Sequence, residues 1–383
     1  MTSWLAVWVL VTLAALPAFS QNLRDMQLFA PVNLSTYGGA PSPNEGYFFC
    51  FDGLMWSISK PETAPIGRRN DTGRVVWYSD DSSETSTVYN THNNSFIRSA
   101  INGGERWDIG RICNRRGWLF SAYRANTQTQ RHTVTQMNIN WNETAWGDQG
   151  NHLPLQGYVD SGETQIENVP ADFETTFMKN RVNTWGVELN YVYRFRRCHH
   201  GGNTELFLGA RYVEFNERFI VEALGGNLAD TIWRTSTDNH IVGPQIGGRW
   251  FKNHKRWVIG VEGRFLAGFN NQSLKQIGRV GSEMSPPGGV GEPLSLGPTD
   301  FNNIAYEEEF SPTGELRIHF AWRWTNNVAF RVGWSGLVIG NIARASCVND
   351  YDLGPSSTMG LAANRNKQIV FLNGLIFGFE INR

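Results

Sequence analysis

Two stretches in the last third of the chain restrict its fold more than any other feature. In residues 256–269 (RWVIGVEGRFLAGF) and 310–324 (FSPTGELRIHFAWRW), large apolar side chains recur at alternate positions, with charged or small residues between them. Successive side chains of a β-strand point to opposite faces, so each stretch has one apolar and one charged face. Long alternating strands with aromatic ends are typical of transmembrane β-barrels. A half-buried strand of a soluble β-sandwich is the alternative.

The connections between the expected strands alternate in length. Short turns are expected near residues 114, 200, 253 and 326, and long polar connections over 57–105, 139–180, 216–239, 270–306 and 341–366. Outer-membrane barrels have short periplasmic turns and long extracellular loops. The chain is therefore predicted to be all-β, an antiparallel up-and-down transmembrane β-barrel over residues 46–383. About ten strands are expected, or about twelve if residues 73–101 add a hairpin to the wall.

The first 45 residues are predicted to lie outside the barrel. The apolar run at 5–16 is shorter than the about 20 residues that a membrane-spanning helix needs. Ala18 and Ser20 place small residues before a cleavage point, so residues 1–20 are interpreted as a secretory signal peptide. Its start departs from the usual pattern, because residues 1–4 contain no Lys or Arg. Residues 21–45 are interpreted as a flexible lead.

The charged faces of the strands predict the character of the lumen. Arg or Lys facing lipid costs about 2–4 kcal/mol at the membrane midplane, so charged faces are expected to turn inward. The candidate lumen residues are Glu188, Arg194, Arg196, Arg211, Arg249, Glu262, Arg264, Glu315, Arg317, Arg323, Arg331 and Glu380. Their excess of Arg predicts an anion-favouring passage. Alternatively, Arg–Glu pairs fill the interior, as side chains fill barrels of about eight strands.

Tryptophans and cysteines give two further predictions about the short-turn end. Trp118, Trp250, Trp257, Trp322 and Trp324 lie beside short turns, where a periplasmic aromatic girdle is expected. Tryptophans scattered through a soluble core are the alternative. Cys50 and Cys113 fall near the periplasmic ends of neighbouring strands. An exported chain can form disulfides, so a bridge between these two is a hypothesis.

The sequence offers little that resembles a catalytic or metal site. The run Cys198-His199-His200 lacks the separated ligand pairs of a zinc site. Asp230, Asp238 and His240 lie near a loop–strand junction and could make a surface protease, but nothing in the sequence gives their geometry. The near-neutral net charge of −1 gives no support for nucleic-acid binding. We expect neither an enzyme nor a cofactor or metal requirement.

The sequence from about residue 205 to 383 also resembles a known family. The matching pieces are GARYVEFNERF (209–219), TDNHIVGPQIGGRW (237–250), GVEGRFLAGFN (260–270), residues 314–345 and FLNGLIFGFEINR (371–383). They resemble the bacterial "putative beta barrel porin" proteins of the outer membrane. The chain ends in Arg383 where many such barrels end in Phe, which makes Phe379 and Ile381 the candidate assembly signal.

The resemblance implies a location in the bacterial outer membrane. The lipid bilayer and the barrel-assembly machinery are then the expected partners, and an oligomer is compatible with the sequence. The expected function is passive diffusion of small solutes through an Arg-rich lumen. The alternative is a plugged structural or surface-binding barrel that acts through its extracellular loops.

Overall fold

The computed structural model describes most of the chain after residue 45. The described residues are 46–67, 93–135, 175–196, 202–225, 230–281, 299–325, 327–351 and 359–382, together with short strands at 75–79, 82–86, 151–154, 159–160, 165–166 and 170–173. The predicted signal peptide and N-terminal lead lie outside them, as does Cys198. No helix within these ranges is long and apolar enough to cross a membrane.

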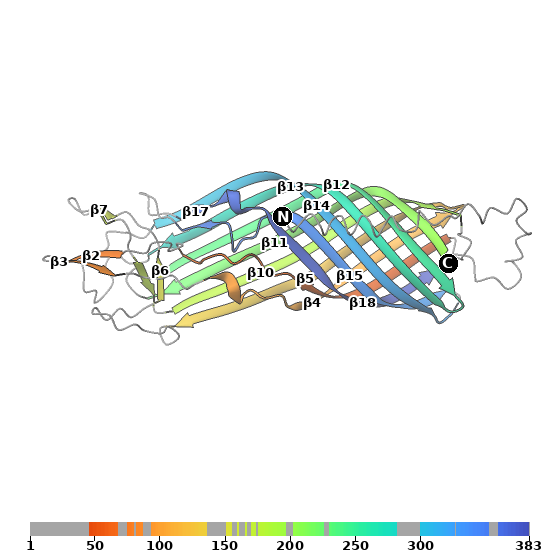
Figure 1. The fold of residues 1–383 in the computed structure, drawn as a ribbon, viewed down its shortest axis with the longest axis horizontal. Coiled ribbons are helices and arrows are strands. Elements are labelled where there is room, and N and C mark those ends of the chain that lie inside the picture. Colours follow the sequence, from red (N-terminus) through yellow and green to blue (C-terminus); the bar gives the residue numbers. More distant parts are fainter. Residues whose placement is uncertain are drawn as a thin grey trace, which may run out of the picture.

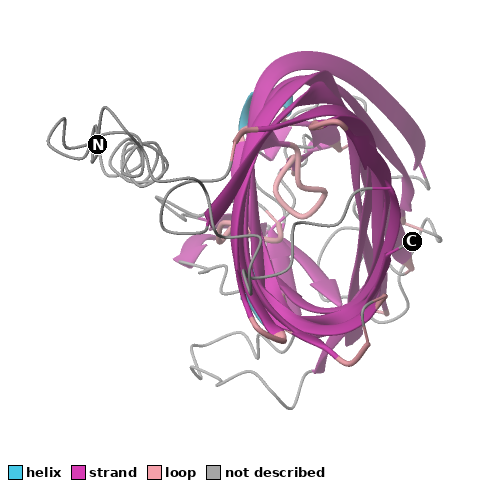
Figure 2. Ribbon diagram, turned by 90° about the vertical axis from the view of Figure 1, so that its right-hand side faces the viewer, coloured by secondary structure: helices cyan, strands magenta, loops and turns pink. Residues whose placement is uncertain are grey.

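Ten antiparallel strands form one closed barrel, which confirms the lower of the two predicted strand counts (Figures 1 and 2). Around the wall the order is β1-β18-β15-β14-β13-β12-β11-β10-β5-β4. The strands are β1 (Gly46–Ile58), β4 (Ile101–Cys113), β5 (Arg116–Thr135), β10 (Thr175–Arg194), β11 (Gly202–Leu224), β12 (Thr231–His254), β13 (Trp257–Val280), β14 (Thr299–Arg323), β15 (Val328–Ile342) and β18 (Gln368–Asn382).

Smaller elements lie in the long connections. The hairpin of β2 (Val75–Ser79) and β3 (Ser82–Ser86) stays outside the wall, so it does not raise the strand count. The other small pairs are β6 (Asn151–Pro154) with β9 (Pro170–Phe173), β7 (Val159–Asp160) with β8 (Gln165–Ile166), and β16 (Asn349–Asp350) with β17 (Gly360–Leu361). Two short 3₁₀ helices, Asn94–Phe96 and Ala363–Arg365, complete the described elements.

The two ends of the barrel differ in their connections. Between β4 and β5 only Asn114 and Arg115 turn the chain, both with positive φ, as a tight hairpin of this kind requires. Between β12 and β13 the turn is Lys255-Arg256. The small strands β2, β3, β6 and β7 gather at the opposite end (Figure 1). The predicted separation of short turns from long connections is therefore correct.

The strands run further into the predicted long connections than expected. β11, β12, β13 and β14 have 23, 24, 24 and 25 residues, so much of the predicted connections 216–239 and 270–306 is strand. In these upper parts many outward side chains are polar, such as Arg218, Asn271 and Lys275, and only a few, such as Ile232 and Ile304, are apolar, which hides the alternation. β15, β18, β1 and β4 have only 15, 15, 13 and 13 residues, so the wall is taller on one side.

Pro244 does not produce the bulge that its position in β12 suggests. Val242 pairs with Phe269 and Gln245 pairs with Leu266, so the register with β13 is the same before and after the proline. Pro244 is exposed on the outer face. A missing N–H at one point of a long ladder is tolerated here without a shift.

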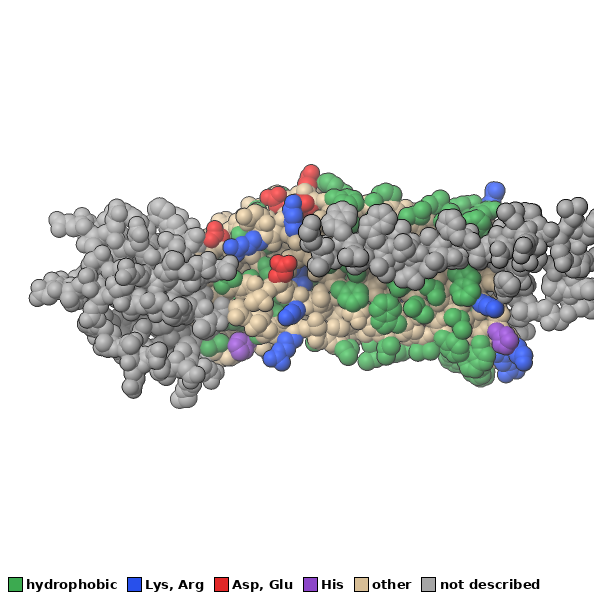
Figure 3. All heavy atoms as spheres, in the orientation of Figure 1, with side chains coloured by type: hydrophobic (Ala, Val, Ile, Leu, Met, Phe, Trp, Pro, Cys, Tyr) green, Lys and Arg blue, Asp and Glu red, His purple; other side chains and the backbone are tan. Residues whose placement is uncertain are grey.

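The outer and inner faces of the wall have opposite compositions. Large apolar side chains are exposed on the outside, among them Ile246, Phe265 and Ile318. They cover the half of the barrel nearer the short turns, whereas charged side chains gather nearer the loop end (Figure 3). The intervening residues of the same strands, such as Gln245, Arg264 and Arg317, are buried inside. Alternation along each strand therefore places these polar and charged side chains on the inner face.

Candidate functional site: the barrel lumen

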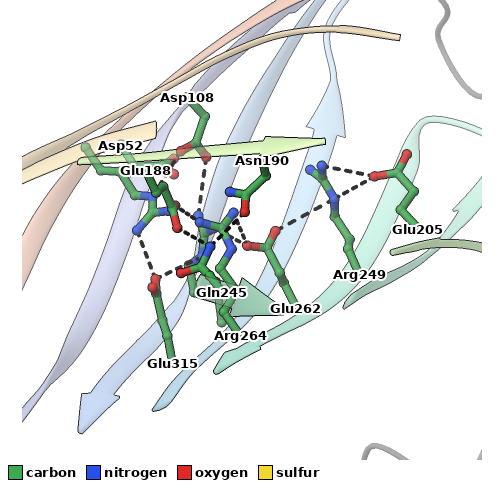
Figure 4. A network of polar contacts seen from close by, with 12 residues as sticks. Asp52, Asp108, Glu188, Asn190, Glu205, Gln245, Arg249, Glu262, Arg264 and Glu315 are labelled. Carbon is green, nitrogen blue, oxygen red and sulfur yellow. Dashed lines mark hydrogen bonds and ion pairs between the residues drawn. The ribbon is translucent and has the colours of Figure 1, made fainter. Parts of the chain in front are cut away.

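The centre of the lumen holds a network of buried ion pairs (Figure 4). Arg106 on β4 donates to Asp108 at 3.1 Å, to Glu188 at 2.8 Å and to Glu315 at 2.9 Å. Its side chain is only 2% exposed. Three strands, β4, β10 and β14, contribute to these contacts, in which one guanidinium satisfies three carboxylates at once. Such pairing is the condition under which buried charges are tolerated.

Further pairs extend this network, hereafter the ion layer, across the lumen. Arg249 Nη2 lies 3.0 Å from Glu205 (Figure 4), and Arg194 Nη2 lies 2.7 Å from the same carboxylate. Arg317 contacts Asp108 at 3.3 Å and also pairs with Glu262. Other contacts join Arg211 to Glu315, Arg264 to Glu188 and Glu262, and Arg331 to Asp52 and Glu380. The arginines therefore face carboxylates and not open water.

An apolar layer lies on the loop side of the ion layer. It consists of Leu54, Trp56, Ile58, Tyr123, Ala125, Val182, Val213, Phe215, Ile241, Leu266, Leu337, Ile339, Ile342, Val370, Leu372 and Ile376, all buried in one contiguous cluster. Eight of the ten wall strands contribute to it, all except β4 and β14. Trp56 is 1% exposed, and its indole Nε1 donates to Ser335 Oγ at 2.7 Å. This cluster, hereafter the apolar layer, fills the cross-section with side chains.

Above the apolar layer the chain between β15 and β18 folds into the barrel. It leaves the wall at Asn341, whose φ is 52°, and residues 343–349 are all buried. We call residues 343–351 the plug segment. Asn239 on β12 holds its start through two hydrogen bonds: its Nδ2 donates to the Ala343 carbonyl at 3.0 Å, and its Oδ1 accepts from the Ala343 N–H at 2.9 Å. Figure 2 shows a loop lying within the ring of strands.

A buried ion pair anchors the plug segment to the wall. Arg344 Nε lies 2.5 Å from Glu217 Oε2, and the Ala345 N–H donates to the same carboxylate at 3.1 Å. Both charged side chains are almost completely buried, at 1% and 0% exposure. Removing either partner alone would leave an uncompensated buried charge, which makes this contact the strongest tie between plug and wall.

The connection between β1 and β4 packs onto the plug segment. Asn94 donates through Nδ2 to the Glu62 carbonyl at 2.9 Å, and the Cys347 thiol donates to the same carbonyl at 3.4 Å. Ile66 and Ile97 join a second apolar cluster with plug residue Tyr351 and with Phe219 and Trp233 of the tall wall. This cluster gives the loop end a core like that of a soluble protein.

A small cavity adjoins the plug segment. Its lining includes Ile58, Ile97, Gln128, Asn180 and Arg344, and its volume is about 10 Å³. A space of this size holds about one water molecule.

The structure brings most of the predicted lumen residues together. Glu188, Arg194, Arg211, Arg249, Glu262, Arg264, Glu315, Arg317, Arg331 and Glu380 all belong to the ion layer. Arg196 instead lies exposed after the end of β10, and Arg323 is half-buried at the turn end of β14, outside the ion layer. The five predicted girdle tryptophans, Trp118, Trp250, Trp257, Trp322 and Trp324, lie at the short-turn end, and Trp257 stacks on Phe320.

Several residues that lie in the lumen were not predicted from the sequence. Arg106 and Asp108 lie in a strand whose outer face includes Gly103 and Glu105, so its alternation is poor. Glu217 and Arg344 lie in stretches that the sequence predicts as connections. The i, i+2 spacing of Arg106 and Asp108 was the available signal, since it places both on one face of a strand.

The proposed bridge between Cys50 and Cys113 is wrong. Both thiols are free, as is that of Cys347. Cys50 pairs in register with Asp108, five residues before Cys113, so about 16 Å of strand separates the two cysteines. A disulfide needs Cα atoms within about 7 Å. Cys347 is buried in the plug segment beyond the apolar band, and burial raises its pKa.

The closed wall, the apolar outer band and the charged interior together define an integral membrane protein of the β-barrel class. The chain belongs to the family described as Putative beta barrel porin-7, whose sequence profile matches residues 173–382. That match confirms the resemblance seen in the sequence. No curated protein matches the chain.

Three solved structures that match this chain are remote from it in sequence. The outer membrane protease OmpT from Escherichia coli is 11% identical, with 89% of this chain and 97% of that chain covered and a TM-score of 0.43. The Ralstonia pickettii toluene transporter TbuX is 8% identical, with 89% and 90% covered and a TM-score of 0.16. The monoaromatic hydrocarbon channel CymD is 8% identical, with 89% of each chain covered and a TM-score of 0.19. Likeness at this level supports no conclusion about activity.

Proposed function

We propose that this protein is an outer-membrane barrel closed to passive diffusion, which acts as a structural or surface-binding protein through its loop end. The observation that carries the proposal is the apolar layer, in which buried side chains such as Trp56, Phe215 and Leu266 belong to one contiguous cluster inside the lumen. An ion that crossed this layer would lose its water without gaining polar partners, which is strongly unfavourable. The proposed role includes neither catalysis nor a cofactor.

The ion layer supports the same function. An anion-selective pore needs unpaired positive charge along a wet passage. Here Arg106 and Arg317 each contact more than one carboxylate, and Arg264 lies between Glu188 and Glu262. Charges neutralised in this way attract few mobile anions. Passive diffusion through an Arg-rich lumen is therefore the second candidate, and the description of the family is what favours it.

The height of the apolar outer band supports a position across a bilayer. Outward apolar residues run from Phe310 to Trp322 on β14 and from Val242 to Trp250 on β12. With about 3.3 Å per residue and a strand tilt of about 40°, these runs span about 30 Å and about 20 Å along the barrel axis. The apolar band of outer-membrane barrels is about 25 Å high, which lies between these two lengths. We propose export by the signal peptide and insertion by the barrel-assembly machinery.

Planar-bilayer recording tests the closed lumen. Protein refolded into detergent, with heat-modifiable gel migration as proof of folding, is added to a bilayer in about 1 M KCl (roughly sevenfold above physiological ionic strength). We expect no single-channel steps, while an open porin prepared in the same detergent gives steps at the same protein concentration. Regular conductance steps that scale with the added protein would overturn the proposal and restore passive diffusion as the function.

A further inference from the structure

A basic face lies on the outside of the barrel, between the apolar band and the loop end. It consists of Arg131, Lys179, Arg181, Arg218, Arg234 and Lys275, on the adjacent strands β5, β10, β11, β12 and β13. All six occupy outward positions and are exposed or half-buried. We refer to these six residues as the basic face.

The pairing register concentrates the charge in two neighbouring rows. Arg181 lies directly opposite Arg218, and Lys179 lies directly opposite Arg131. The first row crosses the strands as Arg181, Arg218, Ser236 and Lys275, each paired with the next. The second row crosses them as Arg131, Lys179, Ile220 and Arg234. Like charges directly opposite each other on one face of a sheet are destabilising. An arrangement that persists against this repulsion is expected to have a compensating anionic partner.

That partner is not a carboxylate of the described part of the chain. Within the described ranges, no ion pair joins any of the six basic side chains to Asp or Glu. The nearest acids in the sheet pattern are Asp238, two residues from Ser236 on β12, and Glu222, two residues beyond Ile220 on β11. Arg218 donates instead to the hydroxyl of Ser236 at 3.3 Å.

The height of the basic face indicates which anion would meet it. Tyr212 and Trp185, whose rings pack 5.3 Å apart, mark the upper rim of the apolar band on β11 and β10. Arg218 lies six residues beyond Tyr212, and Arg181 lies four residues beyond Trp185, which places them about 10–15 Å above that rim at a tilt of about 40°. Phospholipid headgroups extend only about 5–8 Å beyond the hydrocarbon. A glycolipid with an anionic saccharide headgroup reaches higher.

We propose that the basic face binds the phosphorylated or carboxylated saccharide headgroups of an outer-leaflet glycolipid. The geometry suits this ligand, because the five strands spread the charges over about 20 Å of wall at about 4.8 Å per strand. The acyl chains of the same lipid would lie against the apolar band below. The proposal rests on the bilayer position proposed above but is independent of whether the lumen is open.

Binding of fluorescent rough-type lipopolysaccharide to the detergent-solubilised full chain tests this proposal. The variant K179Q/R181Q/R218Q removes three charges from the basic face, and the matched control K252Q/K255Q/R256Q removes three exposed charges from the short-turn end. Each basic side chain near an anionic surface contributes about fivefold to affinity, so the first variant is expected to bind about 100-fold more weakly. The control should stay within about threefold of the natural sequence. Heat-modifiable migration confirms that both variants fold.

Each remaining outcome counts against the proposal. Equal losses in both variants would mean that net charge alone governs binding, and no loss in the first would exclude the basic face. Phosphatidylglycerol vesicles that compete as well as lipopolysaccharide would replace the glycolipid by a phospholipid. A shift in oligomeric state in the first variant would assign the face to a second copy of the chain. Because conductance is not measured here, failure of this test leaves the closed-lumen proposal standing.

Discussion

Arg106 and Glu315 are 209 residues apart in the sequence and meet across the lumen, with Nη1 and Oε1 2.9 Å apart. Their strands, β4 and β14, are not neighbours: β1, β18 and β15 stand between them in the wall. The contact therefore bridges the interior and does not follow the sheet. It joins the two sides of the barrel at the level of the ion layer.

The first prediction concerns this bridge. Arg106→Ala is expected to lower the free energy of unfolding by about 3–5 kcal/mol, because Glu188 and Glu315 each lose a buried partner. Urea titration of the protein in lipid vesicles, followed by tryptophan fluorescence, measures the change. Arg124→Ala, on the exposed outer face of β5, serves as control and should change stability by no more than about 0.5 kcal/mol. Equal effects of the two substitutions would show that the bridge contributes nothing specific.

The second prediction separates pairing from packing at the plug segment. Arg344→Met leaves Glu217 charged and unpaired, so we expect a loss of about 3–5 kcal/mol in the free energy of unfolding. Replacing both residues, as Arg344→Met with Glu217→Leu, should recover a large part of that loss, because no uncompensated charge remains. A double variant that is as unstable as the sum of the two single variants would contradict this account of the anchor.

The third prediction uses Cys347 as a reporter of the plug segment. Its thiol is 4% exposed, and burial raises its pKa, so little reactive thiolate is present at pH 8. In a chain whose other cysteines are replaced by Ser, iodoacetamide should modify Cys347 at least about 100-fold more slowly than a cysteine introduced at exposed Ser99. As the pH is raised, the rate at Cys347 should level off at a higher pH than the rate at the cysteine of Ser99→Cys, because the pKa of the buried thiol is higher. Comparable rates at both positions would show that the plug segment leaves its site readily.

The sequence predicted the wall of this barrel well and its interior poorly. Simple alternation in the stretches 257–269 and 316–322 predicts which residues face the lumen and which face the lipid. The face of each residue depends only on its position along its own strand. The contacts that close the lumen depend on which strands face each other across it. Nothing in the sequence near Arg106 indicates that Glu315 lies opposite, and no local pattern shows that Arg344 enters the barrel to reach Glu217.

The upper halves of the long strands show a second limit. Residues 216–224 of β11 and 270–280 of β13 read as polar connections, since their outer faces carry Arg218, Asn271 and Lys275 where a membrane strand would carry apolar residues. Their inner faces are buried only because the plug segment and the connection between β1 and β4 pack against them. When the inner face of a strand packs against a loop that is distant in the sequence, the residues of the strand alone do not show that this face is buried.

The last prediction asks whether the plug segment alone closes the barrel. Replacing residues 343–366 by a short Gly-Ser connection removes the plug but leaves the ion layer and every member of the apolar layer, since all of them come from wall strands. We expect this variant to remain without conductance steps in a planar bilayer, although its unfolding midpoint should fall because Glu217 loses Arg344.

Adding Trp56→Ala and Phe215→Ala thins the apolar layer, yet the paired charges of Arg106 and Glu315 still cross the lumen beneath it, so a closed barrel is again expected. Steps that appear on removal of the plug alone would instead identify residues 343–351 as a gate over an otherwise open passage, and the family description as a porin would then hold for this chain.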